Sequence, residues 1–115
     1  MDIKGIYEKV NLMTPLEQRR FFNYFDDCVN EMRNMFAGYD KDYVIEEGEE
    51  YSPLQSLEDD NHVRERYYGA LVDGILFYAG AGEEYKSEFI RKARDAFLKY
   101  WTDNAKGRRI KRMRW

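Results

Sequence analysis

Residues 67–80 read YYGALVDGILFYAG, and the fold depends on this stretch more than on any other. Together with the residues before it, the stretch predicts a helix over residues 59–79, because apolar side chains recur there at helical spacing. In its second half the remaining faces are apolar as well, and Asp73 is the single charged residue. The main apolar stripe comprises Val63, Tyr67, Ala70, Leu71, Gly74, Ile75 and Tyr78.

A helix without a polar face must be buried on several sides. In so short a chain it lies either at the centre of a bundle or against another subunit. The second arrangement makes Tyr68, Val72 and Leu76 candidate inter-subunit residues. Asp73 needs a partner in such surroundings, because an unpaired buried carboxylate is costly. We prefer a salt bridge or an interface hydrogen bond to a general acid or base, since no second catalytic group is visible.

Two helical patterns precede this segment. Residues 2–12 carry apolar side chains at helical spacing and predict a short helix. Residues 15–36 predict a longer one, with Thr14 as the N-cap, Pro15 at the first position and Glu17 completing a capping box. Gly38 is its expected end. The apolar stripe of the longer helix comprises Phe21, Phe25, Cys28, Val29, Met32, Met35 and Phe36.

A last helix is predicted after the break at residues 80–82. Glu83 and Glu84 suit its positive N-terminal end, and we expect it to stop between residues 104 and 107. Its apolar stripe comprises Tyr85, Phe89, Ala93, Phe97, Tyr100 and Trp101. The predicted fold is therefore all-α: a small bundle of three main helices and a short N-terminal helix, in one domain of residues 1–107. A basic tail of residues 108–115 follows in extended conformation.

The composition agrees with one helical domain. Of the 115 residues, 43% are apolar and 17% aromatic, which is enough for a core between a few helices. A single cysteine excludes an intramolecular disulfide. No signal-peptide pattern is present, and the longest apolar stretch is shorter than the ~20 residues of a membrane-spanning helix. We expect a cytosolic protein, or part of a particle assembled in the cytosol.

Charge is strongly segregated along the chain. Residues 39–60 contain nine acids and one base, and residues 108–115 contain five bases and no acid. Segregation of this kind reports on partners more than on fold. Residues 39–57 are predicted to form a long acidic loop with one short strand at residues 43–45. Its candidate inter-subunit or channel-facing residues are Glu46, Glu47, Glu49 and Glu50. A solvated or docking surface is preferred to a cation site, because the acids lack EF-hand spacing.

The basic tail is the clearest candidate for a docking segment. Its eight residues would reach roughly 26–29 Å when fully extended. Basic groups can dock on phosphate or on an acidic protein surface, and Trp is a favoured interface anchor. A frayed, solvated terminus is the plainer alternative. We prefer insertion into a partner, with these candidate docking residues: Arg108, Arg109, Ile110, Lys111, Arg112, Met113, Arg114 and Trp115.

A catalytic centre is not apparent. One histidine and one cysteine exclude zinc sites built from several such residues. Cys28 lies on the apolar stripe of its helix and is interpreted as a core side chain rather than a nucleophile. His62 is interpreted as part of an exposed helix start, and no phosphate-binding glycine loop occurs. We therefore predict no enzymatic activity, no metal and no cofactor.

The second half of the chain resembles the small head-to-tail adaptor, or connector, proteins of tailed bacteriophages. The likeness is carried by residues 67–80, by Glu84-Tyr85, and by residues 93–101, ARDAFLKYW. In these adaptors a polar loop, often with a proline, precedes a helix with a Tyr-x-x-Ala-Leu/Ile-Val-like start, and an aromatic-rich last helix follows. Pro53 and Leu54 occupy the loop side here. The long acidic loop departs from that pattern.

The resemblance implies a virion protein. Many copies, commonly twelve, would form a ring beneath the portal that extends the DNA channel and presents a surface to the next tail or neck component. In related adaptors a C-terminal segment docks on the portal or on a neighbouring subunit, and that role passes to residues 108–115. The acidic loop becomes a candidate channel lining close to packaged DNA. No membrane contact is implied.

A second class of function stays open from the residues alone. The basic tail also suits a nucleic-acid-associated or regulatory helical protein, through nonspecific contact with phosphate. Binding of DNA that weakens with salt and needs the tail would favour that alternative, whereas ring formation would favour the adaptor.

Overall fold

The computed structural model describes residues 2–39 and 42–112, and the side chains up to Thr102. The described part contains α1 (Ile3–Met13), α2 (Gln18–Met35), a 3-10 turn η1 (Glu65–Tyr67), α3 (Tyr68–Tyr78) and α4 (Glu84–Arg112). Within those ranges there is no strand, only an isolated antiparallel bridge between Ile45 and Val63. The expected all-helical class is confirmed.

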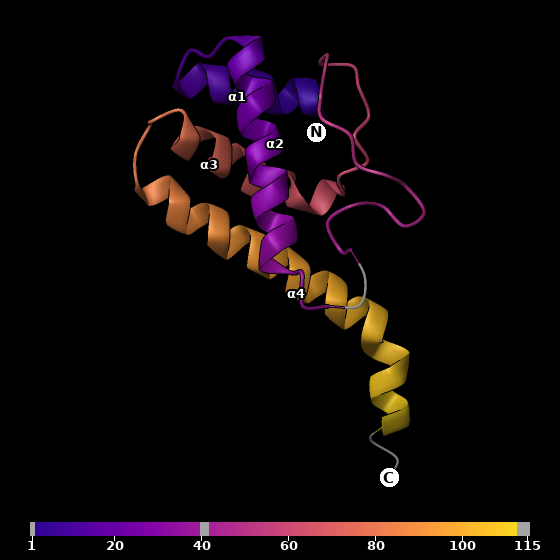
Figure 1. Cartoon of the computed structure of the whole chain (residues 1–115). Helices are drawn as coiled ribbons and strands as arrows, with labels where there is room; N and C mark the ends of the chain where they lie inside the picture. Colours follow the sequence, from indigo (N-terminus) through magenta and orange to yellow (C-terminus); the bar gives the residue numbers. More distant parts are fainter. Residues whose placement is uncertain (1, 40–41, 113–115) are drawn as a thin grey trace.

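Helix α3 is the centre of the molecule. All residues from Ala70 to Leu76 are buried, and α1, α2 and α4 pack around them (Figure 1). Of the two arrangements that an apolar helix allows, this chain uses the centre of its own bundle. Val72 is 5% exposed and Leu76 is 1% exposed, so the prediction that they face another subunit is wrong: the chain's own helices cover them. Tyr68 is half-buried.

The closest helix packing occurs at Gly74. A Cβ atom at this position would lie 2.7 Å from Cys28 Sγ on α2 and 2.8 Å from Phe89 Cδ1 on α4. Both distances are shorter than van der Waals contact, so glycine lets three helices meet at one point. Burial raises the pKa of the Cys28 thiol, and this side chain is a core residue as expected.

The connection between α1 and α2 differs from the prediction. Thr14 closes α1, with its N–H donating to the Val10 carbonyl at 2.9 Å, and Glu17 precedes α2 without a side-chain cap. Asn11 explains the difference, because its Oδ1 accepts from the Leu16 N–H at 2.9 Å and holds the linker extended. The Tyr7 hydroxyl donates to the Leu16 carbonyl at 2.9 Å. The capping box at Thr14 is therefore wrong, and α2 begins at Gln18.

Residues 59–64 are not helical, which also corrects the prediction. Asp60 Oδ1 accepts from the His62 N–H at 2.8 Å, and Asn61 Oδ1 accepts from the Val63 N–H at 3.3 Å. Such short polar side chains satisfy the backbone locally and compete with a helix. His62 has a φ of 64°, in the left-handed region that non-glycine residues rarely adopt. The central helix consequently begins at Tyr68, after the turn η1.

Helix α4 is longer than predicted. Its backbone is helical to Arg112, so residues 108–112 are not extended, and Met113, Arg114 and Trp115 lie outside the described residues. Trp101 is the last side chain whose contacts with the body are described. Residues 102–112, which we name the C-terminal arm, extend away from the other helices (Figure 1) over about 16 Å at ~1.5 Å per residue.

The packing at Gly74 generates a prediction. Gly74→Ala forces a methyl group against Cys28 and Phe89, and it should lower the free energy of unfolding by about 1–3 kcal/mol. Gly69→Ala is the matched control, because nothing lies within 4 Å of its added Cβ on the same helix. This control should leave stability unchanged or raise it by up to about 1 kcal/mol. Urea unfolding of both variants measures the difference, and equal midpoints would contradict the proposed constraint.

Candidate functional site

The base of the C-terminal arm is an aromatic cluster shared by α4 and the segment after α2. Trp101 lies 5.2 Å from Tyr39 and 5.5 Å from Tyr43 between ring centroids, and Tyr100 lies 5.4 Å from Tyr43. Phe97 stacks on Phe36 of the α2 end at 4.2 Å. Aromatic pairs of this kind contribute about 0.5–1.5 kcal/mol each beyond their burial. The cluster therefore fixes the direction in which α4 leaves the body.

Two arginines add cation–π contacts to the aromatic cluster at the start of the C-terminal arm. The guanidinium carbons of Arg64 and Arg66 lie 4.3 and 4.6 Å from the centroid of the Tyr100 ring. Each contact is worth about 0.5–1 kcal/mol where water has access. Both arginines belong to the segment leading into α3, so Tyr100 joins that segment to α4.

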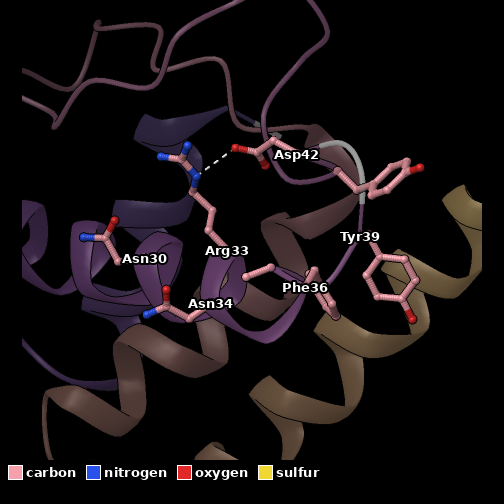
Figure 2. Close-up of a pocket in the computed structure, with 8 residues that line it drawn as sticks. Asn30, Arg33, Asn34, Phe36, Tyr39 and Asp42 are labelled. Carbon is pink, nitrogen blue, oxygen red and sulfur yellow. Dashed lines mark ion pairs between the residues drawn. The ribbon is translucent and has the colours of Figure 1, made fainter.

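A hollow of about 460 Å³ opens beside the end of α2, next to the aromatic cluster. Its wall combines amides, a guanidinium, a carboxylate and aromatic rings (Figure 2): Asn30, Arg33, Asn34, Phe36, Ala37, Tyr39, Asp42 and Tyr43. Arg33 Nε lies 2.8 Å from Asp42 Oδ2, so the two charges compensate each other. The hollow offers hydrogen bonds and ring faces to a partner side chain.

The described part of the acidic loop after the gap at residues 40–41, residues 42–57, is named the acidic segment, and it is anchored to the body along one side. Tyr43, Val44, Ile45 and Leu54 are buried, whereas Glu46, Glu47, Glu49 and Glu50 are all exposed. The expected strand at residues 43–45 is reduced to one bridge, with the Glu46 N–H donating to the His62 carbonyl at 2.8 Å and the Arg64 N–H to the Val44 carbonyl at 3.0 Å. The segment thus lies on the body and presents its carboxylates to solvent.

A second anchor lies at Tyr51, whose hydroxyl donates to Asp26 Oδ1 on α2. Arg33 lies over the same ring, 5.7 Å from its centroid. Burial raises the pKa of Tyr51, and the hydrogen bond to Asp26 raises it further. The phenol therefore remains protonated and tethers the acidic segment to α2.

Asp73 has the salt bridge that its surroundings require. Its Oδ2 lies 2.6 Å from Lys92 Nζ on α4. The Asp73 residue is 7% exposed, whereas 42% of the Lys92 side chain is accessible. This ion pair joins α3 to α4 at the edge of the core, and its role is structural.

His62 occupies a loop rather than the expected helix start. Its Nδ1 lies 3.6 Å from Asp60 Oδ1 and its Nε2 lies 3.5 Å from Glu49 Oε2. Glu46, Asp60 and His62 bring one ligand atom each to within 4.8 Å of the others. Sequence reasoning missed this group because residues 46 and 60 are distant along the chain and meet only through the bridge.

Exposed apolar side chains are a further feature that periodicity did not identify. Leu12 is 87% exposed and Met13 is 55% exposed, both at the C-terminal end of α1, and Leu98 on α4 is 55% exposed. The sequence feature that accompanies this exposed pair is its position directly before the predicted helix start at Thr14-Pro15. The sequence predicts the first helix to end at Leu12 and the next to start at Thr14-Pro15, whereas α1 continues to Met13.

No family model, curated protein or solved structure matches this chain. Among the described residues, none of the helices combines the length and apolarity needed to cross a membrane.

The turn at Asp59 generates a pH prediction. The backbone N–H groups of Gln55 and Ser56 donate to Asp59 Oδ2 at 2.7 and 3.0 Å, and these hydrogen bonds lower the pKa of Asp59 below its ordinary 3.8. A carboxyl group whose pKa is lower in the folded than in the unfolded state stabilises the fold at pH values above its unfolded-state pKa. This contribution is lost as the pH falls through the folded-state pKa. Asp59→Ala should therefore lower the melting temperature at pH 7, and its effect should fade below about pH 4.

Glu58→Ala is the matched control, because it removes a neighbouring exposed carboxylate for which no hydrogen bond is described. Thermal unfolding from pH 3 to 7 compares the two variants. An Asp59→Ala effect of constant size across this range would show that the hydrogen bonds to the carboxylate do not stabilise the fold.

Proposed function

We propose that this protein is a structural subunit of a virion, a head-to-tail adaptor that forms a ring below the portal, extends the DNA channel and joins the capsid to the tail. The proposal combines the resemblance of residues 67–101 to such adaptors with the surfaces of the folded chain. In it the protein acts through binding and assembly rather than through catalysis.

The C-terminal arm is the observation that carries the proposal. Among the side chains of α4 described up to Thr102, Phe97 is the last that is buried, and the helical backbone continues to Arg112. Isolated helices shorter than ~12–15 residues are marginal in water. A projecting helical end rich in Arg and Lys therefore suits a segment that docks on something else, either the portal or a neighbouring subunit.

Ring assembly requires two different surfaces on each subunit, because a ring is built from head-to-tail contacts. The arm supplies one candidate surface. The exposed Leu12 and Met13 at the end of α1 supply another, and Figure 1 places the α1–α2 connection far from the last described turn of α4. This pair replaces Val72 and Leu76 as the apolar candidates for a subunit contact.

The exposed carboxylates of the acidic segment fit a channel wall or a contact with a neighbouring subunit in the same proposal. Glu46, Glu47, Glu49 and Glu50 present negative charge on one side of the body. A negative wall repels the DNA backbone and lets it slide. The twelve-fold copy number, the portal, the next neck component and the virion location remain parts of this proposal that come from the resemblance.

Neutralising the arm tests the proposal. Arg108, Arg109, Lys111, Arg112 and Arg114 would be changed together to Gln in the full-length chain, which removes the charge and keeps the side-chain length near that of the original. Oligomers of the wild-type chain, measured by light scattering and imaged in negative stain, should be rings, and this variant should stay monomeric at the same concentration because it loses its docking charges.

The matched control changes Lys4, Lys9, Arg19, Arg20 and Arg94 to Gln, because all five are exposed and lie outside the arm. It removes the same charge and should still assemble. The same proteins are titrated with duplex DNA at two salt concentrations. A wild-type monomer whose salt-sensitive DNA binding depends on the arm would favour the nucleic-acid alternative. A monomer that binds no DNA would contradict both functions.

A further inference from the structure

The bridge between Ile45 and Val63 brings together two segments that carry metal-binding side chains. The Glu46 N–H donates to the His62 carbonyl at 2.8 Å, which places these two residues side by side. Asp60 reaches the same place through its hydrogen bond to the His62 N–H. The backbone bridge therefore places Glu46 beside His62, and the side-chain hydrogen bond of Asp60 adds the third donor.

The histidine distinguishes this group from the other acidic positions of the chain. Among the side chains that the structure describes, Glu46, Asp60 and His62 form the one group of three or more potential metal ligands, one atom of each lying within 4.8 Å of the others. Carboxylate oxygens are hard donors, and a neutral imidazole nitrogen is preferred by zinc and its neighbours. Two carboxylates and one imidazole together suit a divalent transition-metal ion.

The two ring nitrogens of His62 face different partners. Nδ1 faces Asp60 Oδ1 at 3.6 Å, on the side of the donor group, and Nε2 faces Glu49 Oε2 at 3.5 Å. Histidines that bind metals commonly donate their other N–H to a carboxylate, which fixes the tautomer and orients the ring. Glu49 occupies that supporting position.

The donors are near enough for side-chain rotation to close the site. Two ligands of one tetrahedral zinc ion, each at ~2.1 Å, lie about 3.4 Å apart. The described atoms lie within 4.8 Å of one another, so closure requires them to approach by up to about 1.4 Å, which rotation of the exposed Glu46 and Asp60 side chains can supply. Glu46 and Asp60 also line an open hollow of about 460 Å³, through which a hydrated ion can enter.

The charge around this hollow attracts cations. Apart from Lys4, the charged residues of its wall are all acidic: Asp2, Glu46, Glu58, Asp59, Asp60 and Glu65. A cleft lined by one sign of charge raises the local concentration of counter-ions. Cys28 does not compete for the metal, because it is buried in the core and its pKa is raised.

We propose that Glu46, Asp60 and His62 bind one divalent transition-metal ion, with Glu49 orienting the imidazole and water completing the coordination. The ion cross-links the acidic segment to residues 60–62 and holds the bridge between them. This site shares Glu46 and Glu49 with the carboxylates proposed for the channel wall. It needs neither the C-terminal arm nor a second copy, so it forms in the single chain and its test does not depend on ring assembly.

Zinc titration of the metal-free, full-length chain tests the proposal. Calorimetry should give one site per chain, and zinc should raise the melting temperature because it binds the folded state. His62→Ala, Glu46→Gln and Asp60→Asn should each weaken binding at least about ten-fold, and Glu49→Gln about 10–100-fold. Glu50→Gln is the matched control: it removes the same charge from the same segment, outside the donor group, and should leave the affinity unchanged.

The single histidine of the chain provides a readout of location. Substoichiometric Mn²⁺, a paramagnetic substitute, should broaden the imidazole proton signals of His62, and zinc should shift them. The absence of a saturable zinc site would overturn the proposal. So would binding that persists in His62→Ala, or an equal loss of affinity in Glu50→Gln, since either result would mean general attraction of cations to an acidic surface.

Discussion

The contact of three helices at Gly74 is the constraint on which the structure depends. The missing side chain lets Cys28 of α2 and Phe89 of α4 approach the backbone of α3. Close-packed interiors tolerate even one extra methylene poorly. Because α1, α2 and α4 enclose α3, the apolar surface of α3 is buried within one chain. Surfaces that bind a partner must therefore lie elsewhere on the molecule.

Those surfaces follow from how α4 is held. Phe89, Ala93 and Phe97 bury one side of the helix, and Lys92 pairs with Asp73 at the edge of the core. The aromatic cluster around Trp101 then sets the direction of the helix as it leaves the body. The arm is therefore a backbone continuation of the helix that packs on the core.

The departures at the start of α2 and at residues 59–64 share one physical cause. Asn11 binds the chain after α1, and Asp60 and Asn61 bind their own following backbone. In each case a short polar side chain satisfies a backbone N–H that a helix would otherwise use. Capping and periodicity rules predict a helix at Thr14-Pro15 and at residues 59–64 because these rules use only residue types and their spacing. They do not show whether a backbone N–H will donate to a helical carbonyl or to a nearby side chain.

The sequence by itself determined the all-helical class, the burial of the apolar helix within residues 67–80 on several sides, the burial of Cys28 and the need of Asp73 for a partner. Each of these follows from periodicity or from the cost of burying charge, which are properties of single segments. Tertiary structure decided that α3 is covered by its own chain, that Leu12 and Met13 are exposed, and that Glu46 meets Asp60 and His62. These depend on contacts between distant segments, whose relative placement no local pattern encodes.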